Sequence, residues 1–172
     1  GHLNAVEFLL ERGIKLSTVN ARHTPCSKEG EKLVDGRTAL MLAISNTAPF
    51  TENRKEICLK LVNYYCDLNV QDDSGHTALM HLAKRGTAIR TSYSKEIAEA
   101  MIKRKSKILP KRHRSKENQI LNVKEKVYSY NNMLRDENGC TALYHFSEAL
   151  NKTAVKLILD KNKNVISINS NT

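Results

Sequence analysis

The sequence contains no tryptophan, only three prolines, and four cysteines that show no CxxC spacing. Cysteines scattered in this way indicate reduced thiols in an intracellular protein rather than a disulfide framework. No apolar run approaches the roughly 20 residues that a membrane-spanning helix needs, and no N-terminal signal pattern is present. The sequence therefore predicts an intracellular protein, cytoplasmic or nuclear, without a transmembrane segment.

Catalytic motifs are missing as well. There is no glycine-rich phosphate loop, no GxSxG, no HExxH and no paired-carboxylate segment. His23 and Cys26 have the spacing of half a metal site, but no second half is visible, and we interpret His81 and His145 as helix residues with satisfied hydrogen bonds. The sequence thus predicts that the protein is not an enzyme and binds no cofactor or metal.

What the chain does contain is a repeated segment. The residues DDSGHTALM at 72–80 recur as VDGRTALM at 34–41 and as DENGCTALY at 136–144. After each copy, apolar residues fall at i, i+1, i+4 and i+5, which is the stripe of an α-helix rather than the alternation of a strand. Each unit is therefore predicted to be a turn, a short helix and a longer helix. A single unit of this kind cannot bury its own apolar face, so neighbouring units must stack.

These residues resemble the ankyrin repeat, whose unit reads Asp-x-x-Gly-x-Thr-Pro-Leu-His, then a small-residue pair, Gly-His, Glu-Ile-Val and a leucine run. The opening segment GHLNAVEFLLERG at 1–13 matches the second half of that unit. The resemblance implies an all-α fold, an ankyrin-repeat solenoid of stacked helix-turn-helix units with long inserted loops. It divides one array over 1–172 into a half repeat at 1–16 and repeats at about 33–70, 72–108 and 136–166. Because the chain opens inside a repeat, we expect it to be a fragment of a longer protein.

The sequence departs from the family pattern in two respects. The histidine that ties each turn to the backbone in the family is replaced by Met41, Met80 and Tyr144, so we expect more loosely pinned turns. The spacing between units is also longer, which predicts insertions at 17–32, 47–53, 87–94 and about 106–130. A closer resemblance, to the vertebrate proteins named ankyrin repeat domain-containing protein thirty-four, rests on SGHTALMH at 74–81, the loop after Met41 and VISI at 165–168.

The apolar pattern also predicts which residues form the shared core. The expected core residues are Leu9, Leu40, Ala43, Ile57, Leu61, Leu79, Ala83, Ile97, Met101, Leu143, Val155 and Leu159. Contacts between units are expected to supply most of the stability of such an array.

The resemblance implies a binding function and a place for it. In the family, partners contact the residues around the turn glycine and the exposed end of the first helix. The corresponding positions here are Val34, Asp35, Arg37, Ser45, Asn46, Asp73, Ser74, His76, Lys84, Arg85, Glu137, Asn138, Cys140 and Glu148. The sequence thus predicts a non-catalytic protein-protein interaction module or scaffold, although most of these side chains could simply be solvated, because few contacts dominate an interface.

The net charge of +10 is concentrated in one loop. Eight basic residues and no acidic residue lie within the fourteen positions 103–116: Lys103, Arg104, Lys105, Lys107, Lys111, Arg112, Arg114 and Lys116. Such a loop is consistent with contact to a polyanion, either nucleic acid or acidic phospholipid, and with a nuclear-import signal. It is equally consistent with a solvated, disordered loop.

Overall fold

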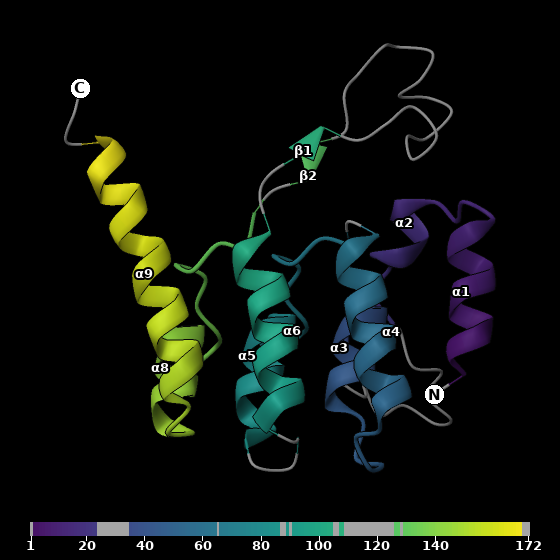
Figure 1. The fold of residues 1–172 in the computed structure, drawn as a ribbon, viewed down its shortest axis with the longest axis horizontal. Coiled ribbons are helices and arrows are strands. Elements are labelled where there is room, and N and C mark those ends of the chain that lie inside the picture. Colours follow the sequence, from purple (N-terminus) through teal and green to yellow (C-terminus); the bar gives the residue numbers. More distant parts are fainter. Residues whose placement is uncertain are drawn as a thin grey trace.

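The computed structural model describes residues 2–23, 35–64, 66–86, 89, 91–104, 107–108, 126–127 and 129–169. Its regular structure is helical apart from one short ribbon (Figure 1). The helices are α1 (Leu3–Glu11), α2 (Leu16–Val19), α3 (Ala39–Ser45), α4 (Glu52–Asn63), α5 (Ala78–Lys84), α6 (Thr91–Lys103), α8 (Ala142–Glu148) and α9 (Lys152–Asn169). The ribbon consists of β1 (Lys107–Ile108) and β2 (Lys126–Val127), which pair antiparallel.

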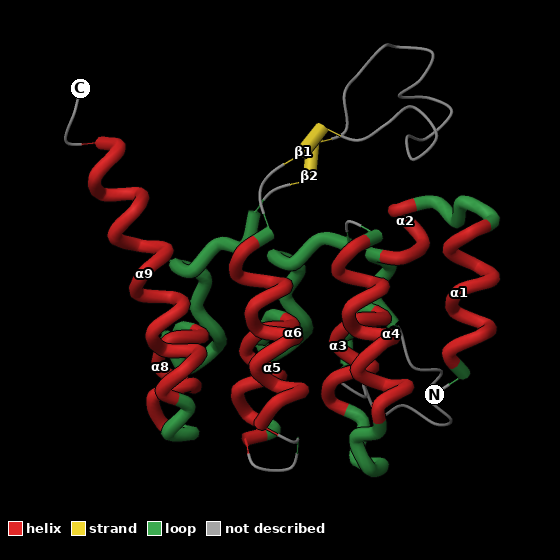
Figure 2. Tube along the Cα trace, in the orientation of Figure 1, coloured by secondary structure: helices red, strands yellow, loops and turns green. Residues whose placement is uncertain are grey.

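The helices stack in a row of pairs, α3 with α4, α5 with α6, and α8 with α9, with α1 beside α4 at the N-terminal end (Figure 2). The first helix of each pair has 7 residues, and the second has 12, 13 and 18 residues in turn. The short helices α3, α5 and α8 contact one another in one layer, and α1, α4, α6 and α9 form the other layer. This arrangement confirms the predicted unit of a turn, a short helix and a longer helix.

A threonine begins each short helix. The side-chain oxygens of Thr38, Thr77 and Thr141 each accept the backbone N–H of the residue three positions on, at 3.4 Å. This bond satisfies one of the N–H groups that the first turn of a helix leaves without a partner. The repeated threonine therefore fixes where each short helix starts, and with it the orientation of the turn that precedes it.

The core lies between the two layers and runs through all three pairs. Leu40, Ile57, Leu61, Leu79, Ala83, Ile97 and Met101 are buried as predicted, and Ala43, Leu143 and Val155 are half-buried against them. The prediction is wrong for Leu9 and Leu159, which are 50% and 43% exposed. Both lie on outer helices of the described array, where only one neighbouring pair is available to cover them. Among the described helices we find none with the length and apolar character needed to cross a bilayer.

Candidate interaction surface

A turn closed by an aspartate precedes each of α5 and α8. The Oδ1 atom of Asp72 accepts the backbone N–H groups of Ser74 and His76 at 3.0 and 2.8 Å. Asp136 accepts the N–H groups of the residues two and four positions on, also at 3.0 and 2.8 Å. An aspartate that accepts N–H groups of its own turn satisfies donors that have no partner in a helix or a sheet. The two turns are therefore closed identically, which the repeated sequence predicts.

Successive turns are bonded to each other. Glu137 N–H donates to the carbonyl of Ser74 at 3.1 Å, and Asp73 N–H donates to the carbonyl of Asp35 at 3.4 Å. Gly75 makes this approach feasible, because its φ is +76° and a Cβ atom there would lie 2.9 Å from the backbone of the next turn. The turns thus form one continuous strip along the array, which we call the turn strip and define as residues 35–37, 72–76 and 136–140.

Two histidines tie the turn aspartates to the short helices. His81 Nε2 lies 2.7 Å from Asp72 Oδ2, and His145 Nε2 lies 2.8 Å from Asp136 Oδ2. The expectation of loosely pinned turns is wrong for these two units, because a histidine one position after Met80 or Tyr144 makes the tie. The shift by one position hid this role in the sequence.

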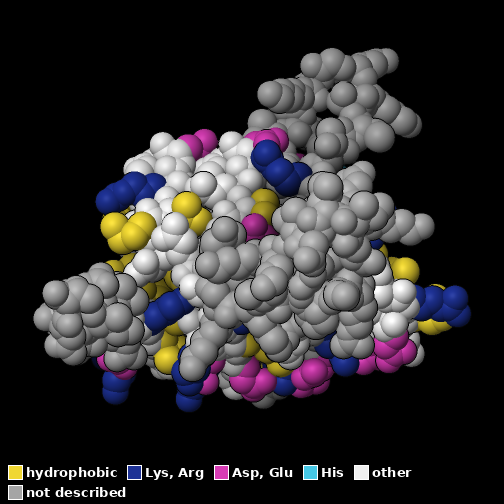
Figure 3. Space-filling view, turned by 90° about the horizontal axis from the view of Figure 1, so that it is seen from above, with side chains coloured by type: hydrophobic (Ala, Val, Ile, Leu, Met, Phe, Trp, Pro, Cys, Tyr) yellow, Lys and Arg dark blue, Asp and Glu magenta, His cyan; other side chains and the backbone are white. Residues whose placement is uncertain are grey.

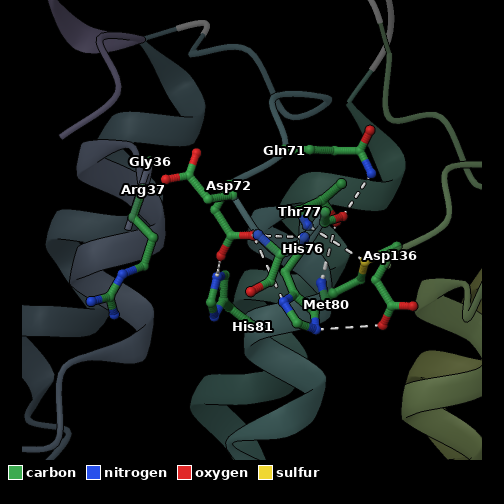
Figure 4. Close-up of polar contacts among 12 residues, drawn as sticks. Gly36, Arg37, Gln71, Asp72, His76, Thr77, Met80, His81 and Asp136 are labelled. Atoms are coloured by element: carbon green, nitrogen blue, oxygen red, sulfur yellow. Dashed lines mark hydrogen bonds and ion pairs between the residues drawn. The ribbon is translucent and has the colours of Figure 1, made fainter. Parts of the chain in front are cut away.

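His76 lies at the centre of the polar network (Figure 4). Its side chain is 8% exposed, with Nδ1 3.7 Å from Asp72 Oδ1 and Nε2 3.4 Å from Asp136 Oδ2. Lys84 Nζ donates to His76 Nε2 at 3.0 Å. Burial and the nearby Lys84 ammonium lower the pKa of His76. Because the ring is buried between two turns, His76 is removed from the predicted set of partner-contacting side chains.

The carboxylate of Asp136 stays ionised in this setting. Its burial alone would raise the pKa, but hydrogen bonds from the Cys140 and Asn138 N–H groups and from His145 hold that pKa below its ordinary value. For the imidazole of His81, burial acts in the other direction and lowers the pKa, although the bond to Asp72 opposes this shift. At neutral pH the network therefore combines an ionised Asp136 with neutral His76 and His81.

The other predicted contact residues differ in exposure. Asn46, Asp73, Lys84, Glu137, Asn138 and Glu148 are exposed, whereas Asp35, Arg37, Ser45, Ser74, Arg85 and Cys140 are half-buried. Val34 lies outside the described residues. Figure 3 shows acidic and basic side chains intermixed on the described part of the visible face.

The first turn also has contacts that the sequence did not reveal. Arg22 Nε donates to the carbonyl of Gly36 at 3.1 Å, and its guanidinium pairs with Asp73. His23 Nδ1 lies 2.7 Å from Asp35 Oδ2, and Asp35 also pairs with Arg37. A segment more than ten residues earlier thus pairs with this turn, so a partner that binds the Asp35 or Asp73 carboxylate must compete with these internal cations.

A hollow of about 320 Å³ lies between the C-terminal ends of α5 and α8. Lys84 and Glu148, both predicted contact residues, line it together with Ala83, Gly86, His145, Ala149 and Leu150. Leu150 is 82% exposed. The structure therefore places a hollow with both apolar and charged lining at the ends of the two short helices that follow the turns.

Only the start of the basic loop falls within the described side chains. Lys103 is exposed and lies 3.2 Å from Glu99 Oε2, but Arg104 is half-buried and donates to the carbonyl of Val62 at 3.1 Å. That carbonyl is in the last turn of α4, where a cation is favourable. Arg104 is therefore an anchor on the array rather than a free charge of the loop, which corrects the prediction. The side chains of Lys105, Lys107, Lys111, Arg112, Arg114 and Lys116 lie outside the described residues.

Comparison with known proteins agrees with this architecture. The family model of the ankyrin repeat matches residues 35–73, which include the first turn, α3, α4 and the start of the second turn. A comparison with curated proteins found no match. The chain therefore contains an ankyrin repeat at 35–73 within an all-α array of stacked helix pairs, and ankyrin repeats are generally protein-protein interaction modules. The closer resemblance to the proteins numbered thirty-four stays a prediction.

Proposed function

We propose that this chain is a non-catalytic protein-binding module whose partner lies across the turn strip and the short helices α3, α5 and α8. The observation that carries the proposal is the continuity of the turn strip. Backbone bonds join its turns, and Asp73, Glu137 and Asn138 are exposed along it. A rigid strip presents its side chains at low entropic cost on binding.

The hollow between α5 and α8 supports the same placement. Lys84 and Glu148 offer charges of opposite sign at its wall, and the exposed Leu150 offers apolar surface. An apolar anchor surrounded by polar groups is typical of the centre of a protein interface. We therefore expect Lys84 and Glu148 to contribute more to affinity than the half-buried residues of the first turn.

The test is an affinity measurement with a partner identified by proximity labelling and then purified. The combined substitutions Lys84→Ala, Glu137→Ala and Glu148→Ala should weaken binding by about tenfold or more. Matched control substitutions, Lys95→Ala and Lys156→Ala, remove exposed charges from the layer of longer helices and should leave the affinity unchanged. A loss of affinity only in the control protein would contradict the proposal and assign the interface to the layer of longer helices.

The second candidate function is display of the basic loop for polyanion binding or nuclear import. The observation that favours it is the attachment of the residues that flank the insertion. Before it, Arg104 donates to the carbonyl of Val62 at 3.1 Å. Asn69 Nδ2 donates to the carbonyl of Ser129 at 3.2 Å, Asn131 N–H donates to Asn69 Oδ1 at 2.7 Å, and β1 pairs with β2. The residues on either side of the basic loop are thus held against the array.

Salt dependence separates the two functions. Binding to RNA or to anionic vesicles through the loop should fall steeply with ionic strength, because each neutralised phosphate releases counterions. Deletion of 105–116 should abolish that binding and any nuclear accumulation while leaving the helical array folded. Polyanion binding that survives the deletion would exclude the loop as its site.

A further inference from the structure

Three donor atoms from two neighbouring units converge in the polar network. They are His76 Nε2, Asp136 Oδ2 and His145 Nε2, which all lie within 4.8 Å of one another in side chains that are buried. Asp136 Oδ2 is 3.4 Å from His76 Nε2 and 2.8 Å from His145 Nε2. Figure 4 shows His76 and Asp136 pointing toward each other across the boundary between the two units.

We propose that His76, Asp136 and His145 bind a divalent transition metal ion, with Zn²⁺ the best fit. Ligands at about 2.0 to 2.1 Å from a tetrahedral zinc ion lie about 3.3 to 3.4 Å apart. The separation of His76 Nε2 and Asp136 Oδ2 matches that spacing, and His145 Nε2 must withdraw by about half an ångström. Two imidazoles and one carboxylate also form a donor set that favours zinc, because magnesium and calcium bind mainly oxygen ligands.

The surroundings orient the first two ligands. Asp136 Oδ1 accepts two backbone N–H groups of its own turn, which leaves Oδ2 available for a metal. On the far side of His76, Nδ1 lies 3.7 Å from Asp72 Oδ1, which is too long for a hydrogen bond but places a carboxylate on the side from which one commonly supports a zinc-bound histidine. Asp136 is thus held in place by its own turn, and His76 has a carboxylate behind it.

His145 can become a ligand by a change of tautomer. In the absence of an ion, an N–H at His145 Nε2 donates to Asp136, whereas coordination requires the lone pair of that nitrogen. Among the described residues, His145 Nδ1 has no hydrogen-bond partner. The proton can therefore reside on Nδ1, and no hydrogen bond other than the one to Asp136 has to be broken.

Lys84 is the natural competitor for the ion. Its ammonium lies 3.0 Å from His76 Nε2 and donates to the lone pair that a metal ion would need. Lys84 is exposed and also lines the hollow between α5 and α8, as does His145. The Lys84 side chain can move away from His76, and the hollow gives an ion a route to His145, which is the proposed ligand in its lining.

The test uses the untagged chain and zinc sulfate in isothermal titration calorimetry, with cobalt as a spectroscopic probe. We expect one zinc ion per chain with a Kd on the order of 1 μM or tighter, and visible Co²⁺ bands typical of tetrahedral coordination. His76→Gln and His145→Gln should each weaken binding by about 100-fold or more, since even outer-shell substitutions cost 10 to 100-fold. Lys84→Met should tighten it, because the competing ammonium is removed.

The matched control is His81→Gln, which removes a histidine that bonds the other turn aspartate and should leave zinc affinity unchanged. Circular dichroism before titration shows whether each variant is folded, and Lys84→Met tests the site without removing any ligand. Absence of saturable zinc binding in both the native chain and Lys84→Met would overturn the proposal. So would equal loss in His81→Gln and His145→Gln, which would assign the ion to a different set of residues.

Discussion

Replacement of Leu79 by alanine tests whether stability comes from packing between units. Leu79 is 1% exposed on α5, the short helix of the central pair, which contacts both α3 and α8. The substitution removes three carbon atoms, worth about 0.8 kcal/mol each, or about 2.4 kcal/mol in total. A residual cavity adds to that loss, so we expect a decrease in the free energy of unfolding of about 2 to 5 kcal/mol.

The assay is urea unfolding followed by helical circular dichroism, with the slope of the transition compared to show whether the array still unfolds cooperatively. Leu159→Ala is the matched control, because this leucine is 43% exposed. We expect that substitution to lower the free energy of unfolding by less than about 1 kcal/mol. A loss of under about 0.5 kcal/mol for Leu79→Ala would be typical of a surface residue and would refute the inferred packing.

Two further predictions concern the turn strip. The pKa values of His76 and His81 are lowered in the folded state, so their contribution to stability is fully present above the ordinary pKa of 6.5 and is lost as the pH falls below that value. Thermal melts from pH 7.5 to 5 should therefore show a falling melting temperature. The substitution His76→Gln should make this pH dependence shallower. Gly75→Ala should destabilise the chain by about 1 to 3 kcal/mol, because the added methyl group meets the next turn at a φ of +76°. Gly13→Ala, at a similar φ of +74° but with no atom within 4 Å, should cost less in the same melts, and equal losses would exclude turn stacking as the cause.

The fold was predictable because its signals are local. The threonine caps, the turn aspartates and the helical spacing of apolar residues all act within about ten residues, and each unit repeats them. The errors at Leu9 and Leu159 arose because burial depends on which neighbours exist, whereas the apolar pattern shows only which face of a helix is apolar.

The candidate site was less predictable because it depends on stacking. His76 meets Asp136 and His145 only after two turns separated by a long insertion are brought together, and no spacing motif records that contact. Arg104 is a similar case, because its bond to the Val62 carbonyl depends on how α6 packs on α4. Both residues looked like surface groups in the sequence, since histidine in a turn and arginine in a basic run are usually solvated.

Hydrogen-deuterium exchange of the chain, alone and with its purified partner, tests the central claim most directly. If the partner lies across the turn strip and the short helices, slowed exchange should appear in peptides covering 71–85 and 135–149, with little change in α4 and α6. Protection confined to α4, α6 and α9, or to the insertion at 105–128, would contradict the proposed binding surface.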